Sequence, residues 1–113
     1  MALYKGQFLR EDQEQGGVFQ QREKLSRTFI SVVAFLGERC LAAGEFEKAI
    51  TTYRKGAEIE PLSEVLQEGL IRACAAAGYR VAAIQAYRGY EAVLKKALDI
   101  QPSRRLAQLI ADL

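Results

Sequence analysis

Two similar stretches decide the fold of this chain: CLAAGEFEKAITTYR at 40–54 and CAAAGYRVAAIQAYR at 74–88. Each residue of the first has its counterpart 34 positions later, and nine of the 19 positions from 36 to 54 are identical at that offset. Ordinary composition gives about one or two identities by chance. The repeat therefore predicts two structural units of the same kind, one after the other.

A period of 34 residues is the length of a helix, a tight turn, a second helix and a linker, which is the unit of a tetratricopeptide array. Gly44 and Gly78 follow helical runs, where a left-handed C-cap lets the next helix fold back. Pro61 and Pro102 disfavour helix at the residue before them. We expect helices near 18–43, 46–59, 62–77, 80–100 and 103–113.

The expected first helix has one apolar face, formed by residues three, four and seven positions apart: Val18, Leu25, Phe29, Val32, Val33, Leu36, Cys40 and Leu41. No run of residues alternates as a strand does. The predicted fold class is all-α, with about five helices in tetratricopeptide-like antiparallel hairpins that form a right-handed array. We expect a single domain, in which residues 1–16 are an N-terminal tether and 17–113 the helical part.

Composition excludes several function classes. The chain has 113 residues, no histidine, two cysteines and a net charge of +2. Without histidine, the usual general base and histidine-containing zinc sites are missing. We therefore expect no catalytic residue, no cofactor and no metal site. The sequence also has no membrane span or signal peptide, so we expect a cytoplasmic protein.

The residues that could carry chemistry have simpler structural interpretations. Cys40 and Cys74 occupy equivalent repeat positions, so we expect both thiols to pack in the core as small hydrophobes. Three basic residues follow an acid by four positions, which are Arg27 after Glu23, Arg72 after Glu68 and Lys95 after Glu91. A nucleic-acid surface needs unopposed basic residues. Direct DNA contact by this chain is therefore not expected.

The first helices of stacked hairpins line a concave surface, where such scaffolds take a partner. The repeat register places six residues on this surface, which are the candidate partner-binding residues: Ser31, Ala34, Glu38, Val65, Glu68 and Arg72. Two units make a shallow groove. The alternative interpretation is therefore that these residues form ordinary surface or intramolecular contacts.

Several segments together resemble one known family. These are LYKGQFL at 3–9, REKL at 22–25, EPLSE at 60–64 and QPS at 101–103, combined with the two repeat stretches. In this combination the chain resembles the bacterial transcriptional activator domain of antibiotic-regulatory-protein-type regulators, from about Leu3 to Leu113. The resemblance implies a tetratricopeptide-like domain that serves contacts in transcription regulation and usually follows a winged-helix DNA-binding domain.

Two functional hypotheses follow. The first is a non-catalytic regulatory and protein-interaction domain of a bacterial transcriptional regulator, a fragment of a longer protein that contacts DNA through a domain absent from these 113 residues. Its partner would be a fused domain, the transcription machinery or a second copy, because an array of two units has uncapped ends. The second hypothesis is a stand-alone adaptor that binds a partner's peptide in its concave face.

Overall fold

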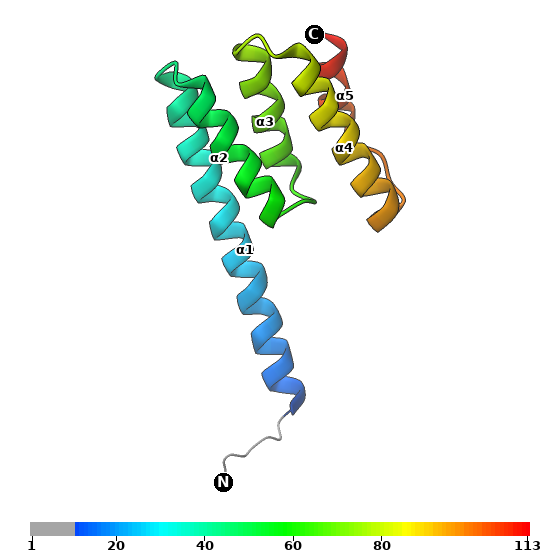
Figure 1. The fold of residues 1–113 in the computed structure, drawn as a ribbon. Helices are drawn as coiled ribbons and strands as arrows, with labels where there is room; N and C mark the ends of the chain where they lie inside the picture. Colours follow the sequence, from blue (N-terminus) through cyan, green and yellow to red (C-terminus); the bar gives the residue numbers. More distant parts are fainter. Residues whose placement is uncertain (1–10) are drawn as a thin grey trace.

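The computed structural model describes residues 11–113, with side chains from Gln20 onward, and every regular element in this part is a helix. The all-α class and the tetratricopeptide-like hairpins predicted from the repeat are confirmed. Figure 1 shows the five helices in chain order: α1 Glu11–Ala42, α2 Phe46–Ile59, α3 Glu64–Ala76, α4 Arg80–Leu98 and α5 Arg104–Ala111.

The start of α1 differs most from the prediction. We expected a helix from residue 18, whereas α1 begins at Glu11 and continues through Gly16 and Gly17. A glycine inside a helix costs only about 1 kcal/mol, and the glutamate and glutamine residues before this pair are good helix formers. The predicted boundary between tether and helical part therefore falls inside α1, while residues 1–10 of that tether lie outside the described residues.

The two hairpin turns have the same hydrogen bonds, as the repeat predicts. Gly44 and Gly78 have positive φ angles of 76° and 86°. The next residue donates its backbone N–H to a carbonyl five positions back, Glu45 to Cys40 and Tyr79 to Cys74, each at 2.8 Å. This is the Schellman arrangement, which satisfies the last carbonyls of α1 and α3.

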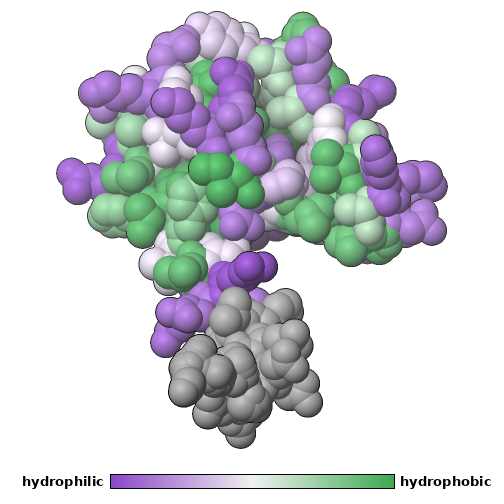
Figure 2. Space-filling view, turned by 60° about the horizontal axis from the view of Figure 1, so that its bottom comes forward, coloured by the Kyte–Doolittle hydropathy of each residue, from purple (hydrophilic) through white to green (hydrophobic). Residues whose placement is uncertain are grey.

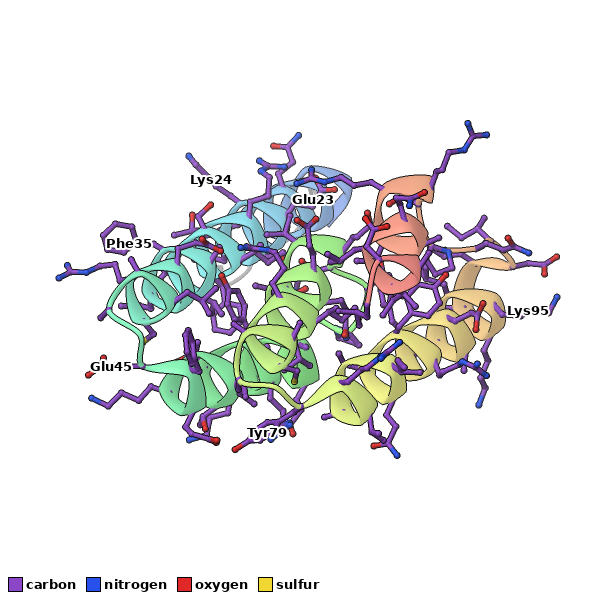
Figure 3. The ribbon with its side chains drawn as sticks, turned by 90° about the horizontal axis from the view of Figure 1, so that it is seen from above. Glu23, Lys24, Phe35, Glu45, Tyr79 and Lys95 are labelled. Atoms are coloured by element: carbon purple, nitrogen blue, oxygen red, sulfur yellow. The ribbon has the colours of Figure 1, made fainter. Side chains whose placement is uncertain are left out.

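The helices form a two-layered array. Seen from above in Figure 3, α1, α3 and α5 lie on one side, and α2 and α4 on the other. Each helix contacts its neighbours in the chain, and α1 also contacts α3. At 32 residues, α1 is about 48 Å long. It therefore extends well beyond the other helices (Figure 1).

Small and aromatic residues of the repeat contribute to the core beside leucines and isoleucines. Ala49 and Ala83 are completely buried, which lets the helices of each hairpin approach closely. Tyr53 is 1% exposed, and its ring lies so near Gly37 and Gly69 that a Cβ atom at either glycine would overlap it. The Cys74 thiol is buried, whereas Cys40 is half-buried against the core, and both thiols are free. Burial raises the pKa of the Cys74 thiol.

The apolar face expected on the first helix is divided in two, which corrects the prediction of a single face. Val33 packs in the core, and Cys40 and Leu41 lie half-buried beside it. By contrast, Leu25, Val32 and Leu36 are 64%, 50% and 48% exposed. The space-filling view in Figure 2 likewise shows apolar residues reaching the surface among hydrophilic ones.

Candidate functional site

Charged side chains link the three helices α1, α3 and α5. Arg72 of α3 donates a hydrogen bond to the Glu38 carboxylate of α1, and its Nε atom lies 3.7 Å from the Glu68 carboxylate. Arg105 of α5 pairs with Glu68 from the other side at 3.0 Å. We call these four residues, Glu38, Arg72, Glu68 and Arg105, the charge ladder. Its charges alternate in sign from α1 to α5.

Tyr53 connects the charge ladder to the core. Its hydroxyl donates a hydrogen bond of 2.8 Å to Glu38 and lies 3.4 Å from the carbonyl oxygen of Ala34. The hydrogen bonds from Arg72 and Tyr53 hold the pKa of Glu38 below its ordinary value, against a smaller effect of burial. Burial, together with the Glu38 carboxylate, raises the pKa of Tyr53. Glu38 therefore carries its negative charge over a wide pH range.

The structure brings some of the six predicted partner-binding residues together and leaves others apart. Glu38, Glu68 and Arg72 belong to the charge ladder, so their side chains make intramolecular contacts, as the alternative interpretation describes. Ala34 is half-buried and contributes its carbonyl oxygen. Ser31 and Val65 are exposed and belong to no hydrogen bond or ion pair of the ladder.

Sequence reasoning missed Arg105 and the hydroxyl of Tyr53. In the sequence, Arg105 is one of two neighbouring basic residues, Arg104 and Arg105, that nothing else distinguishes. The repeat does not help, because the positions 34 and 68 residues before Arg105 hold Ile71 and Gly37. A signal for the Glu38–Arg72 pair was present, since these residues of opposite charge occupy equivalent positions in adjacent units.

A cavity of about 370 Å³ opens beside the charge ladder, between α3 and α5. Its wall is mixed in character, with both signs of charge and one leucine. The lining residues are Glu68, Arg72, Arg105, Gln108, Leu109 and Asp112. The arrangement suits polar contacts with another protein's side chains, because charges of either sign meet a complementary group here.

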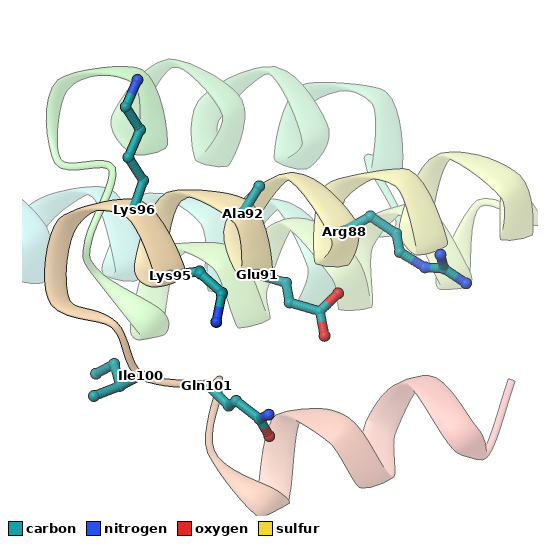
Figure 4. A pocket seen from close by; sticks show the side chains of 7 residues that line it. All are labelled: Arg88, Glu91, Ala92, Lys95, Lys96, Ile100 and Gln101. Carbon is teal, nitrogen blue, oxygen red and sulfur yellow. The ribbon is translucent and has the colours of Figure 1, made fainter.

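A second hollow, of about 470 Å³, lies between the C-terminal part of α4 and the connection to α5 (Figure 4). Lys95 pairs with Asp99 at 3.5 Å here, instead of with Glu91 as the four-residue spacing predicted. The residues that line it are all exposed, so this hollow has no buried polar group that could bind a ligand. They are Arg88, Glu91, Ala92, Lys95, Lys96, Ile100 and Gln101.

Residues 11–113 contain no helix with the length and apolar character that crossing a bilayer requires. Among the described side chains, from Gln20 onward, no group of three or more cysteines, aspartates or glutamates is placed to hold a metal ion.

Comparisons with known proteins agree with the fold. A family described as "Bacterial transcriptional activator domain" matches residues 1–113. The chain is also similar to a protein of Mycosarcoma maydis named small glutamine-rich tetratricopeptide repeat-containing protein 2, at 33% identity over 51 residues. This match covers 45% of the chain and 14% of that protein, so the chain spans a small part of its relative. No solved structure matches the chain.

Proposed function

This chain belongs to the bacterial transcriptional activator domain family, and we propose on that premise that it is a non-catalytic domain through which a transcriptional regulator contacts another protein. The observation that supports the proposal best is the match over all 113 residues together with the array of helical hairpins. Such arrays present side chains of successive hairpins on one continuous surface. The domain would act in the cytoplasm, with DNA contacted by a separate part of the regulator.

The proposed contact surface is the side of α1, α3 and α5 that carries the charge ladder. It comprises the six residues Ser31, Ala34, Glu38, Val65, Glu68 and Arg72, extended by Arg105 of α5. Val65 is 56% exposed and supplies an apolar contact. Arg72 and Glu38 keep side-chain exposures of 39% and 51%, so a partner's charged group can reach them. Charges at such a surface favour specificity and the rate of association.

A reporter experiment tests this proposal. The full chain is fused to an unrelated DNA-binding domain, and transcription is measured in bacteria from a promoter that carries the corresponding operator. We expect activation above that of the DNA-binding domain alone. Arg72→Ala should reduce activation, and Arg88→Ala, in α4, should leave it unchanged. Circular dichroism of both variants checks that they are folded.

The outcomes separate the two functional hypotheses. Activation that is lost with Arg72→Ala supports a regulatory contact at the charge ladder. The fusion could instead fail to activate transcription while the purified chain binds a peptide and loses this binding with Arg72→Ala. In that case the adaptor hypothesis replaces the regulatory hypothesis. Activation that is equally strong with Arg72→Ala and Glu38→Ala would contradict the proposed surface while leaving the regulatory role in place.

A further inference from the structure

The side of α1 that faces away from α3 carries an uncovered apolar patch. We call it the outer patch and define it by Leu25, Val32, Phe35 and Leu36, which are 64%, 50%, 61% and 48% exposed. Leu25, Val32 and Leu36 follow one another at steps of seven and four, so they lie along one stripe of the helix, with Phe35 at its edge. In Figure 3, Phe35 points outward from α1, away from the other helices.

The repeat shows what kind of element covers such a patch. The counterparts of Val32 and Leu36 in the second unit are Leu66 and Leu70, which are 0% and 7% exposed. α2 covers them, since α2 packs against α3 and a Cβ atom placed at Gly56 would lie 3.2 Å from Leu66. Among the described residues, no helix takes the equivalent position before α1. The outer patch is therefore the position of a missing helix.

Among residues 20–42 of α1, the charges around the outer patch are of one sign. Within residues 20–42, a turn of 100° per residue places Arg39 in the patch and Arg22 and Lys24 on its two edges. Glu23 falls on the opposite side of the helix, and Glu38 is held by Arg72 toward α3. Figure 3 shows Lys24 and Glu23 on different sides of α1. A second copy of the chain would bring these basic residues against each other, which disfavours self-pairing.

We infer that the outer patch of α1 binds an acidic amphipathic helix of a partner protein, in the position that α2 takes against α3. The partner helix would present small residues four positions apart, as α2 does with Ala49 and Ala57. It would carry no aromatic residue at the position of Tyr53, because Phe35 of α1 stands where Gly69 of α3 leaves room for the Tyr53 ring. Acidic residues on its edges would face Arg22, Lys24 and Arg39. The outer patch is separate from the charge ladder, so this inference and the proposed function succeed or fail independently.

Peptide binding tests the inference. The probe is a fluorescent synthetic helix of about four turns, with three alanines at four-residue spacing and glutamates on both edges. A second peptide carries lysines in place of the glutamates. Fluorescence anisotropy with the full chain should show saturable binding of the glutamate peptide and at least about tenfold weaker binding of the lysine peptide, a difference of about 1.4 kcal/mol.

Matched variants locate the contact. Val32→Asp and Leu36→Asp should each weaken binding of the glutamate peptide about tenfold or more. Val81→Asp is the control, because Val81 is a similar side chain, 68% exposed, in α4. Lys24→Glu combined with Arg39→Glu should also weaken binding, and it keeps the test decisive if an aspartate in the patch disturbs the fold.

Several results would overturn the inference. They are the absence of saturable binding, equal binding of both peptides, and binding that Val32→Asp and the charge-reversed variant leave unchanged. Light scattering adds the test for a second copy. A doubled mass that returns to that of the monomer in Val32→Asp would assign the outer patch to self-association.

Discussion

At the scale of single residues, Tyr53 holds the first three helices together. Its ring fills the narrow space between Gly37 of α1 and Gly69 of α3, and its hydroxyl fixes Glu38. Tyr53 recurs as Tyr87 in the repeat, which marks it as a structural position. The two glycines could not be predicted, since the residues 34 positions away from them are Ile71 and Phe35, which share none of their properties.

Replacing Gly69 with alanine should destabilise the protein. The new Cβ atom would overlap the Tyr53 ring, and overpacking of a core costs about 1–3 kcal/mol. This cost exceeds the helix-propensity gain of at most about 1 kcal/mol from replacing glycine. Urea titration should therefore show a lower free energy of unfolding for Gly69→Ala.

Gly89→Ala is the matched control for that variant. Gly89 also lies inside a helix, α4, but nothing stands within 4 Å of a Cβ atom there. Only the propensity gain remains, so Gly89→Ala should raise the free energy of unfolding by about 0.5–1 kcal/mol. Equal effects of the two substitutions would contradict the packing of Tyr53 against α3.

The charge of Glu38 should make stability depend on pH. Its pKa in the folded protein is below the ordinary value of 4.5, mainly through the hydrogen bond from Arg72. A lowered folded pKa stabilises the protein above the unfolded value, and this stabilisation is lost as the pH falls through the folded value. The free energy of unfolding should therefore decrease as the pH falls below about 4.5.

Glu38→Gln isolates the contribution of this residue. Because the Glu38 side chain is 51% exposed, the loss at neutral pH should be small, about 0.2–1 kcal/mol. Urea titrations over a pH series should show the difference between the parent chain and the variant shrinking below pH 4.5 and vanishing in stronger acid. A difference that stays constant with pH would contradict the ion pair with Arg72.

At the scale of helices, the sequence predicted where most elements lie. The bounds of α2 agree with the predicted 46–59, because a glycine turn and a proline delimit that helix. The prediction failed at the start of α1, because the expected helix began after Gly16 and Gly17, whereas α1 continues through this pair. α4 ends at Leu98, two residues before the expected end, because Asp99 adopts a left-handed conformation with a φ of 54°.

The N-cap of α3 offers a test at this scale. The Ser63 hydroxyl accepts a hydrogen bond of 3.3 Å from the backbone N–H of Leu66. Ser63→Ala removes this acceptor and should lower the free energy of unfolding by about 0.5–2 kcal/mol. Ser63→Gly should lower it by only about a few tenths of a kcal/mol. Thermal unfolding followed by circular dichroism measures both. A larger loss of stability for Ser63→Gly than for Ser63→Ala would show that the hydroxyl does not cap the helix.

At the scale of the whole molecule, the repeat predicted the array of hairpins but not the different burial of equivalent residues in its two units. Residues in equivalent positions have the same local structure, yet Val32 is 50% exposed and its counterpart Leu66 is completely buried. Burial depends on whether a preceding hairpin is present, which a local pattern cannot show. For the same reason, the repeat pointed to Glu38, Glu68 and Arg72 of the candidate site but not to Arg105, which lies beyond the second hairpin.

The difference in burial between Val32 and Leu66 predicts that replacing each with alanine changes the free energy of unfolding by different amounts. Leu66→Ala should cost about 2–5 kcal/mol, because it leaves a cavity in the core. Val32→Ala should change the free energy of unfolding by no more than about 0.5 kcal/mol, since half of that side chain is already in water. Urea titration of the two variants provides the comparison. A large loss for Val32→Ala would mean that the outer patch is covered within the chain.

The identical turns after α1 and α3 also bear on how such a chain can change its length in evolution. Loss of residues 44–77 would join Ala43 directly to Gly78, so that α1 would lead into α4 through an equivalent turn with the same hydrogen bonds. Duplication of that segment would insert one more hairpin in the same way. Gene rearrangement in steps of 34 residues thus preserves every turn.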